Sequence, residues 1–282
     1  MINAKRTSLL CPQCNKLISS DEPTCPYCGL STPGSLWRNN VLVRVYLKPD
    51  HIIRSIIFTN IVLFARSIIL NPTTLNLSMN PFTLFSPSNR ILLLLGATGT
   101  VPIDHFHRWW TLISASYLHG GILHIFFNMV VLRQIAPLSI QEYGFNRMVM
   151  VYTIGGAIGF YVSYLAGIKF TIGASASLFA LIGSILYYGK SRGGTYGQII
   201  FKQIIGWVIA LFFFGLLIPG INNWAHGGGL AGGILLGFLL GYNERKKETY
   251  FHKILALSCI VSTILILIWA IASTFYYRFT IL

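Results

Sequence analysis

Residues 224–242 read WAHGGGLAGGILLGFLLGY, an apolar stretch in which one helical face carries only glycine. The glycines of that face recur every four residues, at Gly229, Gly233, Gly237 and Gly241. His226 lies almost one turn before them on the same face. Small residues at this spacing let two helices approach closely in lipid, and an ionisable side chain there indicates a functional site with a partner. The stretch predicts a tightly packed transmembrane helix with a functional histidine.

The composition of the whole chain is that of an integral membrane protein. Of its 282 residues, 54% are hydrophobic and 10% are charged, and the mean hydropathy is +0.65. Ordinary soluble domains do not reach these values. A crossing of the hydrocarbon core takes about 17 to 25 residues. Seven stretches meet this length, at 52–70, 118–137, 148–167, 172–188, 199–219, 224–242 and 254–276. The prediction is an all-α, multi-pass membrane protein.

The distribution of charge predicts the orientation of these spans. The net charge is +14. The basic residues are distributed as the membrane topology requires, so no nucleic-acid partner is expected. Most basic residues fall on the side of the amino terminus; the other side holds Arg66, Arg90, Arg108, Lys169 and Arg278. Because cytoplasmic segments carry such an excess, the amino terminus is predicted to be cytoplasmic. The expected location is the lipid bilayer of a bacterial cytoplasmic membrane.

A serine stands at the start of the fourth predicted span, in Gly173-Ala174-Ser175-Ala176. Two consecutive spans return the chain to the side it left, so Ser175 and His226 share the non-cytoplasmic face. A serine beside a histidine is the minimal set for acyl transfer, although Ser175 alone is also typical of a helix cap and the glycines alone of plain packing. Every acidic residue lies outside the predicted membrane core, which leaves a dyad: Asp21, Glu22, Asp50, Asp104, Glu142, Glu244 and Glu248.

Three polar residues gather at the outer end of the second predicted span. His124 and Asn128 are four residues apart and share one helical face, while His119 lies at the junction of loop and helix. A metal site of His119, His124 and His226 is an alternative. However, the chain lacks His-Glu-x-x-His and any carboxylate within a span. An amide and an imidazole at the level of the serine fit an oxyanion hole instead, so no catalytic cofactor is expected.

Two Cys-x-x-Cys pairs near the amino terminus predict a metal site. Four thiolates at this spacing are typical of one structural zinc ion, bound by Cys11, Cys14, Cys25 and Cys28. Disulfides are the alternative, and a reducing cytoplasm disfavours them. The predicted organisation is a zinc ribbon over 1–32, a linker over 33–50, a six-helix core over 51–243, and a basic cytoplasmic loop with the seventh helix over 244–282.

These motifs resemble the rhomboid family of intramembrane serine proteases. The matching elements are His119-x4-His124-x3-Asn128, Gly173-Ala174-Ser175 and Ala225-His226-x2-Gly229-x3-Gly233, in the family's order and span positions. The resemblance covers about residues 52–242. It implies a rhomboid-like six-helix bundle plus one additional C-terminal transmembrane helix. Amino-terminal zinc ribbons also occur on some bacterial members of the family.

The resemblance implies catalytic roles for the matching residues. Ser175 is the nucleophile, and His226 is the general base and then the general acid. The oxyanion donors are His124, Asn128 and the backbone amide of Ser175. The implied reaction is hydrolysis of peptide bonds in or near the transmembrane segments of single-span membrane proteins. The alternative is a catalytically silent scaffold that binds membrane clients; such relatives generally lack the serine or the histidine.

The resemblance also implies structural roles. His119 holds the long first loop, and Phe179 occupies a position where the family often has an aromatic ring stacked on the histidine. The remaining structural positions are Gly173, Gly229 and Gly233. One residue departs from the pattern: the family usually has Trp-Arg shortly before the histidine motif, whereas this chain has Trp110-Thr111. Arg108 is the expected substitute for the missing arginine.

Overall fold

The computed structural model of the chain describes residues 8–11, 16–27, 32–34, 49–70, 84–218 and 220–280, with side chains left undescribed at 49–50 and 275–280. The chain divides into two units, Met1–Arg54 and Ser55–Leu282. The division falls inside helix α2 (Pro49–Ile69). Most of the linker predicted over 33–50 lies outside the described residues.

The first unit contains a small antiparallel hairpin. Strand β1 (Ser8–Leu10) pairs with strand β2 (Leu17–Ser19), and Leu9 lies opposite Ile18. Ile18 is buried in one cluster with Cys11 and Cys25. These two cysteines are half of the predicted zinc ligands; Cys14 and Cys28 lie outside the described residues.

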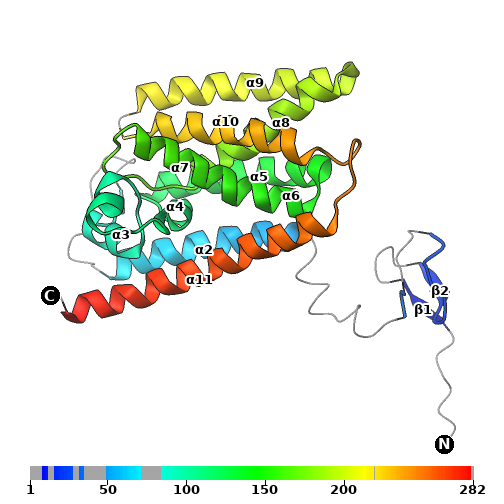
Figure 1. Ribbon diagram of the computed structural model, residues 1–282, viewed down its shortest axis with the longest axis horizontal. Helices are drawn as coiled ribbons and strands as arrows, with labels where there is room; N and C mark the ends of the chain where they lie inside the picture. Colours follow the sequence, from blue (N-terminus) through cyan, green and yellow to red (C-terminus); the bar gives the residue numbers. More distant parts are fainter. Residues whose placement is uncertain are drawn as a thin grey trace, which may run out of the picture. The chain divides into compact units, whose positions relative to one another are not determined.

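The second unit is a bundle of helices (Figure 1). A helix occupies each predicted span, and the third span is a continuous run of three helical pieces. The elements are α2, α5 (Ile122–Tyr143), α6 (Phe145–Met150) with η4 (Val151–Gly155) and α7 (Gly156–Leu165), α8 (Ser175–Arg192), α9 (Gly194–Leu217), α10 (Asn223–Leu240) and α11 (Tyr250–Thr280). Figure 1 shows α9 and α11 on opposite sides of the bundle. The predicted all-α fold is confirmed.

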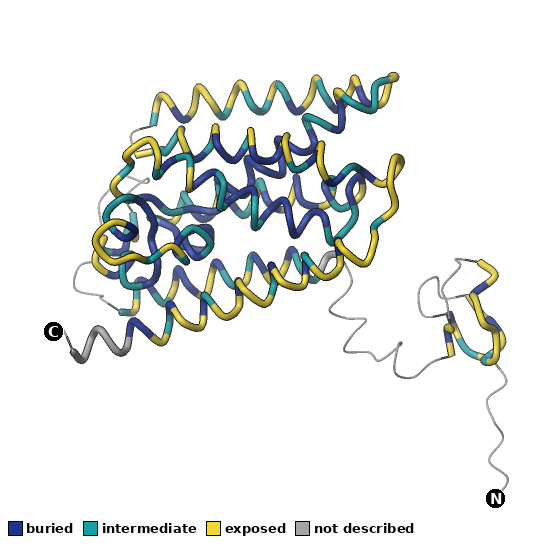
Figure 2. Tube along the Cα trace, viewed as in Figure 1, coloured by how far each residue is buried: buried dark blue, intermediate teal, exposed yellow. Residues whose placement is uncertain are grey.

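Five helical segments of the described chain are long and apolar enough to cross a membrane by length and composition. They are His51–Ile69, Ile122–Tyr143, Phe145–Leu165, Gly194–Leu217 and Tyr250–Thr274. Helices α8 and α10 are not among them. Lys190 and Arg192 lower the mean hydropathy of α8, and Asn223, His226 and several glycines lower that of α10. Protein surrounds α8 instead, and Figure 2 shows it buried over most of its length. The helix that begins with Ser175 therefore lies inside the bundle.

Helix α10 packs on α8 through glycine. A β-carbon added at Gly229 would lie 2.3 Å from the carbonyl oxygen of Ala176, and one at Gly233 would lie 1.9 Å from that of Ala180. Gly183 of α8 meets the carbonyl oxygen of Leu230 in the same way, at 2.2 Å. The two helices therefore touch main chain to main chain, at a separation that no larger residue permits.

Gly241 does not take part in this contact, so the prediction of a fourth glycine in the row was wrong. Helix α10 ends at Leu240, and Gly241 has a φ of 67°, a positive value that favours glycine and is not helical. The four-residue spacing of the glycines in the sequence therefore extends past the end of α10.

A second glycine face on α10 was not predicted. A β-carbon at Gly228 would lie 2.6 Å from Val162 Cβ, and one at Gly232 would lie 2.9 Å from Ile158 Cγ2. Val162 and Ile158 belong to α7. Glycine thus brings α10 close to two neighbouring helices, α7 and α8.

The loop before α5 is folded and tied to the segment before α8. It contains α3 (Asn89–Leu95), η2 (Val101–His105), α4 (Thr111–Ser114) and η3 (Ala115–Tyr117). Thr98 and Thr171 exchange two backbone hydrogen bonds, of 3.1 and 2.7 Å. Ile91, Leu92 and Leu95 of α3 are buried by the protein, and α11 packs against this helix.

Two hydrogen bonds connect segments within this loop, where the family resemblance implies one arginine. Thr111 is fully buried, and its hydroxyl lies 3.0 Å from Thr98 Oγ1. Arg108 donates from Nη1 to the carbonyl oxygen of Leu93, at the end of α3, over 3.1 Å. With threonine at position 111, the loop therefore still has hydrogen bonds that connect its own segments.

Candidate active site

Ser175 is the first residue of α8, and a turn at Gly173 brings it there. Gly173 has a φ of 125°, which favours glycine, and its N–H donates to the carbonyl oxygen of Ala115 over 2.9 Å. A β-carbon at Gly173 would lie 2.7 Å from His124 Nε2. The turn requires glycine for its backbone conformation and for the space that His124 occupies.

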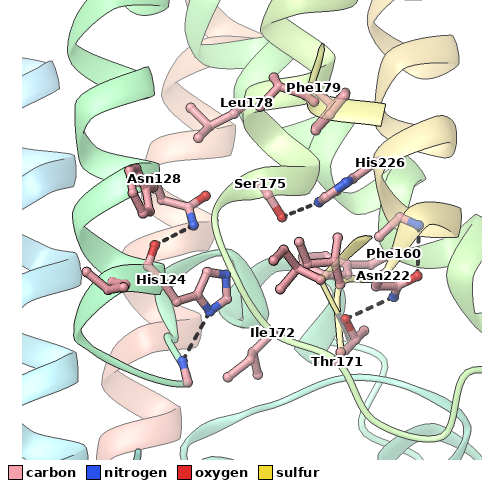
Figure 3. A pocket seen from close by; sticks show the side chains of 18 of the residues that line it. His124, Asn128, Phe160, Thr171, Ile172, Ser175, Leu178, Phe179, Asn222 and His226 are labelled. Carbon is pink, nitrogen blue, oxygen red and sulfur yellow. Dashed lines mark hydrogen bonds between the residues drawn. The ribbon is translucent and has the colours of Figure 1, made fainter. Parts of the chain in front are cut away.

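His226 lies in the first turn of α10 and points at Ser175 (Figure 3). Its Nε2 is 2.9 Å from Ser175 Oγ, a hydrogen-bond distance between residues 51 apart in the sequence. The close contact of α8 with α10 makes this possible, because Gly229, three residues after His226, rests on Ala176, the residue after Ser175.

An aromatic ring holds the imidazole of His226. Phe179 is stacked on it, with ring centroids 4.3 Å apart and an interplanar angle of 16°. Nδ1 of His226 is buried and has no hydrogen-bond partner among the described residues. If Nε2 is to accept the serine proton, the neutral ring must carry its own proton on Nδ1. The described part of the chain therefore offers a serine and a histidine without an acid behind them.

His124 presents an N–H group to the turn before Ser175. Its Nδ1 accepts a hydrogen bond from the backbone N–H of Gly120 over 3.3 Å. A neutral imidazole that accepts at Nδ1 carries its proton on Nε2, and Nε2 is the atom that lies against Gly173. The backbone N–H of Ser175, at the positive end of α8, is a second donor at this place.

Asn128 lies on the same side of the site but is partly committed to its own helix. Its Nδ2 donates to the carbonyl oxygen of His124, one turn earlier in α5, over 2.7 Å. Its Oδ1 is buried and has no hydrogen-bond partner among the described residues. The amide therefore keeps one N–H hydrogen for another acceptor.

These side chains line a cavity of about 670 Å³. Its walls come from α3, α5, α7, α8, α9, α10 and the segments before α3, α8 and α10. They are mostly apolar and include Leu123, Phe127, Phe160, Phe170, Leu211 and Phe214. Figure 3 shows Ser175, His226 and Asn128 together at this cavity. A concave, mostly apolar site with a few polar groups is typical of a binding or catalytic pocket.

Comparison with known proteins identifies the family of this chain. A family model described as "Rhomboid domain" matches residues 107–243, a range that contains Ser175, His226, His124 and Asn128. RHOMBOID-like protein 1 of Arabidopsis thaliana is 31% identical over 220 residues, which cover 72% of this chain and 56% of that protein. This chain belongs to the rhomboid family. With its apolar helices, the rhomboid domain makes the chain an integral membrane protein.

Other relatives of the rhomboid domain come from plants and bacteria. RHOMBOID-like protein 5 of Arabidopsis thaliana is 35% identical over 161 residues, covering 56% of this chain and 52% of that protein. Rhomboid protease GluP of Bacillus subtilis (strain 168) is 31% identical over 134 residues, covering 48% of this chain and 26% of that protein. This chain spans about half the length of several curated relatives that it matches.

His119 of the rhomboid domain is held by packing. It is fully buried, neither ring nitrogen has a hydrogen-bond partner among the described residues, and its ring meets that of His124 edge-on at 5.0 Å. The first loop is instead bonded to the turn just before α5 by Ser86 Oγ, which donates to the carbonyl oxygen of Gly120 over 2.7 Å. His119 was expected to hold this loop, but the described residues show no side-chain hydrogen bond from His119 to it.

Sequence reasoning missed Asn222 of the rhomboid domain. Asn222 lines the cavity and bonds to Ser163 and Thr171, which are 59 and 51 residues away in the sequence. An asparagine directly before a helix indicates an N-terminal cap. Such local chemistry cannot reveal distant partners, so the sequence held a signal for the cap alone.

Proposed function

We propose that this rhomboid domain is a serine endopeptidase that hydrolyses peptide bonds in or near the transmembrane segments of membrane proteins. The 2.9 Å contact between Ser175 Oγ and His226 Nε2 carries the proposal, because it joins a nucleophile to a base inside an apolar cavity. A relative of this chain bears the name rhomboid protease.

The mechanism follows from the geometry of the site. Ser175 Oγ attacks the scissile carbonyl carbon while Nε2 of His226 takes the hydroxyl proton. Negative charge develops on the carbonyl oxygen, where the backbone N–H of Ser175, Nε2–H of His124 and the remaining amide hydrogen of Asn128 supply donors. His226 then gives its proton to the leaving amine, and an acyl-enzyme remains on Ser175. Water attacks this ester with His226 as the base, which releases the second product.

The substrates that fit this site are single-span membrane proteins. A transmembrane helix keeps its carbonyl groups in internal hydrogen bonds, so a substrate must unwind locally before Ser175 can reach one. Segments with small, weakly helical residues around the cut unwind more readily. The apolar walls formed by Phe160 and Phe214 suit such a segment.

We propose that the site faces the non-cytoplasmic side of a bacterial cytoplasmic membrane. Ser175 begins α8 and His226 lies in the first turn of α10, so both lie at one end of the bundle. Arg192 ends α8, and Arg245 and Lys246 follow the last residue of α10, at the opposite end. Basic residues favour the cytoplasm, which supports a cytoplasmic position for that end.

The test of this function is cleavage by the purified full-length chain in liposomes. The reporter is a membrane protein with a single transmembrane segment that contains glycine and alanine. We expect two fragments with a cut in or near that segment, and labelling of Ser175 by a fluorophosphonate probe. If the protein binds the reporter but neither cuts it nor reacts with the probe, it is a silent scaffold and the proposal is wrong.

We also propose that the amino-terminal segment holds a structural zinc ion, bound by Cys11, Cys14, Cys25 and Cys28. Cys11 and Cys25 are buried in one cluster with Ile18, and cysteine thiolates are typical ligands of structural zinc. Within the described ranges, no group of three or more His, Cys, Asp or Glu side chains is placed to hold a metal. The other two cysteines lie outside those ranges. Zinc bound there would stabilise a hairpin too small to fold on its own core.

Zinc content is the measurement that tests the ribbon. We expect about one zinc ion per chain by mass spectrometry, as a site made of four cysteines requires. Cys11→Ser should lower the zinc content several-fold and make the hairpin sensitive to protease. Cys259→Ser is the matched control, because Cys259 is buried in α11, and it should keep its zinc. Equal zinc content in the Cys11→Ser variant and the control would contradict the site.

A further inference from the structure

Asn222 lies directly before α10 and caps the helix that carries His226. Its Oδ1 accepts a hydrogen bond from the backbone N–H of Ala225 over 3.1 Å. Its carbonyl oxygen accepts one from the backbone N–H of His226 itself, over 3.2 Å. Both donors belong to the first turn of a helix, where N–H groups have no partner inside the helix. Asn222 therefore fixes the start of α10 through its side chain and its main chain.

The amide nitrogen of Asn222 reaches the other side of the site. Nδ2 lies 2.6 Å from Ser163 Oγ in α7 and 2.9 Å from Thr171 Oγ1. Thr171 stands four residues before Ser175, and its backbone is paired with that of Thr98 in the first loop. Figure 3 shows Asn222 between Thr171 and the start of α10. One side chain thus connects the helix of the base to the segment that leads to the nucleophile.

Every polar group of this amide has a partner, which fixes its orientation. Oδ1 must face the N–H of Ala225, since an amide nitrogen there would set a donor against a donor. Both hydrogens of Nδ2 then meet hydroxyl oxygens of residues that are themselves buried, Ser163 and Thr171. Asn128 at the same cavity differs, because its Oδ1 has no partner among the described residues. Asn222 is therefore held by its surroundings to a single rotamer.

We propose that Asn222 is a positioning residue that sets the spacing between His226 and Ser175, an inference that rests on the proposed peptidase function. Serine at 222 keeps an oxygen for the N–H of Ala225 but has no nitrogen to reach Ser163 and Thr171. Alanine provides neither group. Displacement of a catalytic group by about 1 Å can cost about 100-fold in rate. The 2.9 Å contact of the dyad depends on such placement.

The experiment separates this positioning from the capping of α10. Asn222→Ser keeps a good helix cap and loses the connection to α7 and to Thr171, whereas Asn222→Ala loses both. On the partner side, Thr171→Val removes the hydroxyl oxygen and Thr171→Ser retains it. Asn223→Ser is the matched control. In the described part of the chain, Nδ2 of Asn223 donates to the carbonyl oxygen of Gly215 in α9, over 2.9 Å, and Asn223 is not among the residues that line the cavity.

We expect Asn222→Ser to lower kcat for the reporter about 10- to 100-fold, with KM within about threefold, and to slow fluorophosphonate labelling of Ser175 by a similar factor. Thr171→Val should act in the same direction, and Thr171→Ser should restore most of the rate. The double variant Asn222→Ser/Thr171→Val should be no slower than Asn222→Ser alone, because the contact that Thr171→Val removes is already lost in Asn222→Ser. Asn223→Ser should stay within about twofold of the unchanged chain, and melting temperatures are compared for all variants.

Several results would overturn the inference. One is a kcat for Asn222→Ser within twofold of the unchanged chain, which would reduce Asn222 to a helix cap. A second is a higher KM at unchanged kcat, which would make Asn222 a substrate contact. A third is an equal loss of rate in Asn223→Ser, which would indicate general destabilisation. If the unchanged chain neither cleaves nor takes the probe, the peptidase proposal fails and this inference with it; if the unchanged chain is active, only the inference is at stake.

Discussion

Replacing Ser175 with alanine is expected to abolish cleavage of the transmembrane reporter. The change removes the oxygen that lies 2.9 Å from His226 Nε2, and no other hydroxyl group is recorded at that nitrogen in the described part of the chain. Loss of the nucleophile in a serine protease costs about 10⁴-fold or more in kcat. The measurement is fragment formation in liposomes, with fluorophosphonate labelling as an independent readout.

His226→Ala should be about as inactive as Ser175→Ala, and the double variant no worse than either. The two side chains act as one unit, so removing the second after the first takes nothing further away. Ser184→Ala is the control, because the hydroxyl of Ser184 bonds within α8, to the carbonyl oxygen of Leu181, away from the cavity. Cleavage that survives in either dyad variant at near its full rate would refute the assignment of the site.

Replacing Gly233 with alanine is expected to produce the largest loss of stability among the glycine-to-alanine changes in α10. The new β-carbon would lie 1.9 Å from the carbonyl oxygen of Ala180, far inside van der Waals contact, and main chain cannot rotate away as a side chain can. Overpacking of this kind costs about 1–3 kcal/mol or more. Because the displaced helix also carries His226, we expect kcat to fall together with the melting temperature in detergent.

Gly227→Ala is the matched control in the same helix. Gly227 is exposed, and nothing lies within 4 Å of the position that its β-carbon would take. Alanine favours a helix over glycine by about 1 kcal/mol, so this variant should be at least as stable as the unchanged chain. If Gly233→Ala melts at the same temperature as Gly227→Ala, the close contact of α8 with α10 is not what holds the bundle together.

The sequence alone predicted the parts of this molecule that depend on periodicity and composition. The seven helical segments follow from the lengths of the apolar stretches, and the meeting of Ser175 with His226 follows from counting spans and from glycine at Gly229 and Gly233. Both arguments concern features that repeat along a helix, and a repeat can be read without knowledge of the fold.

What the sequence did not predict depends on partners that are distant along the chain. Asn222 is recognisable as a cap, but its contacts with Ser163 and Thr171 exist only after α7, α8 and α10 have packed. Gly228 points to α7 for the same reason. At Gly241 the periodic pattern extended past the helix, because a glycine that ends a helix reads the same as one that packs within it.

The glycine contacts of α10 also determine where this protein can change. A helix seated against its neighbours by main-chain atoms has no side-chain rotamers with which to absorb a substitution on those faces. The outer face of α10 is different, since Leu235, Phe238 and Leu239 are exposed and are not part of the glycine contacts with α7 and α8. Random mutagenesis of α10 should therefore recover tolerated residues almost entirely from the outer face. Substitutions on this outer face can therefore adapt α10 to a bilayer of another thickness without displacing His226.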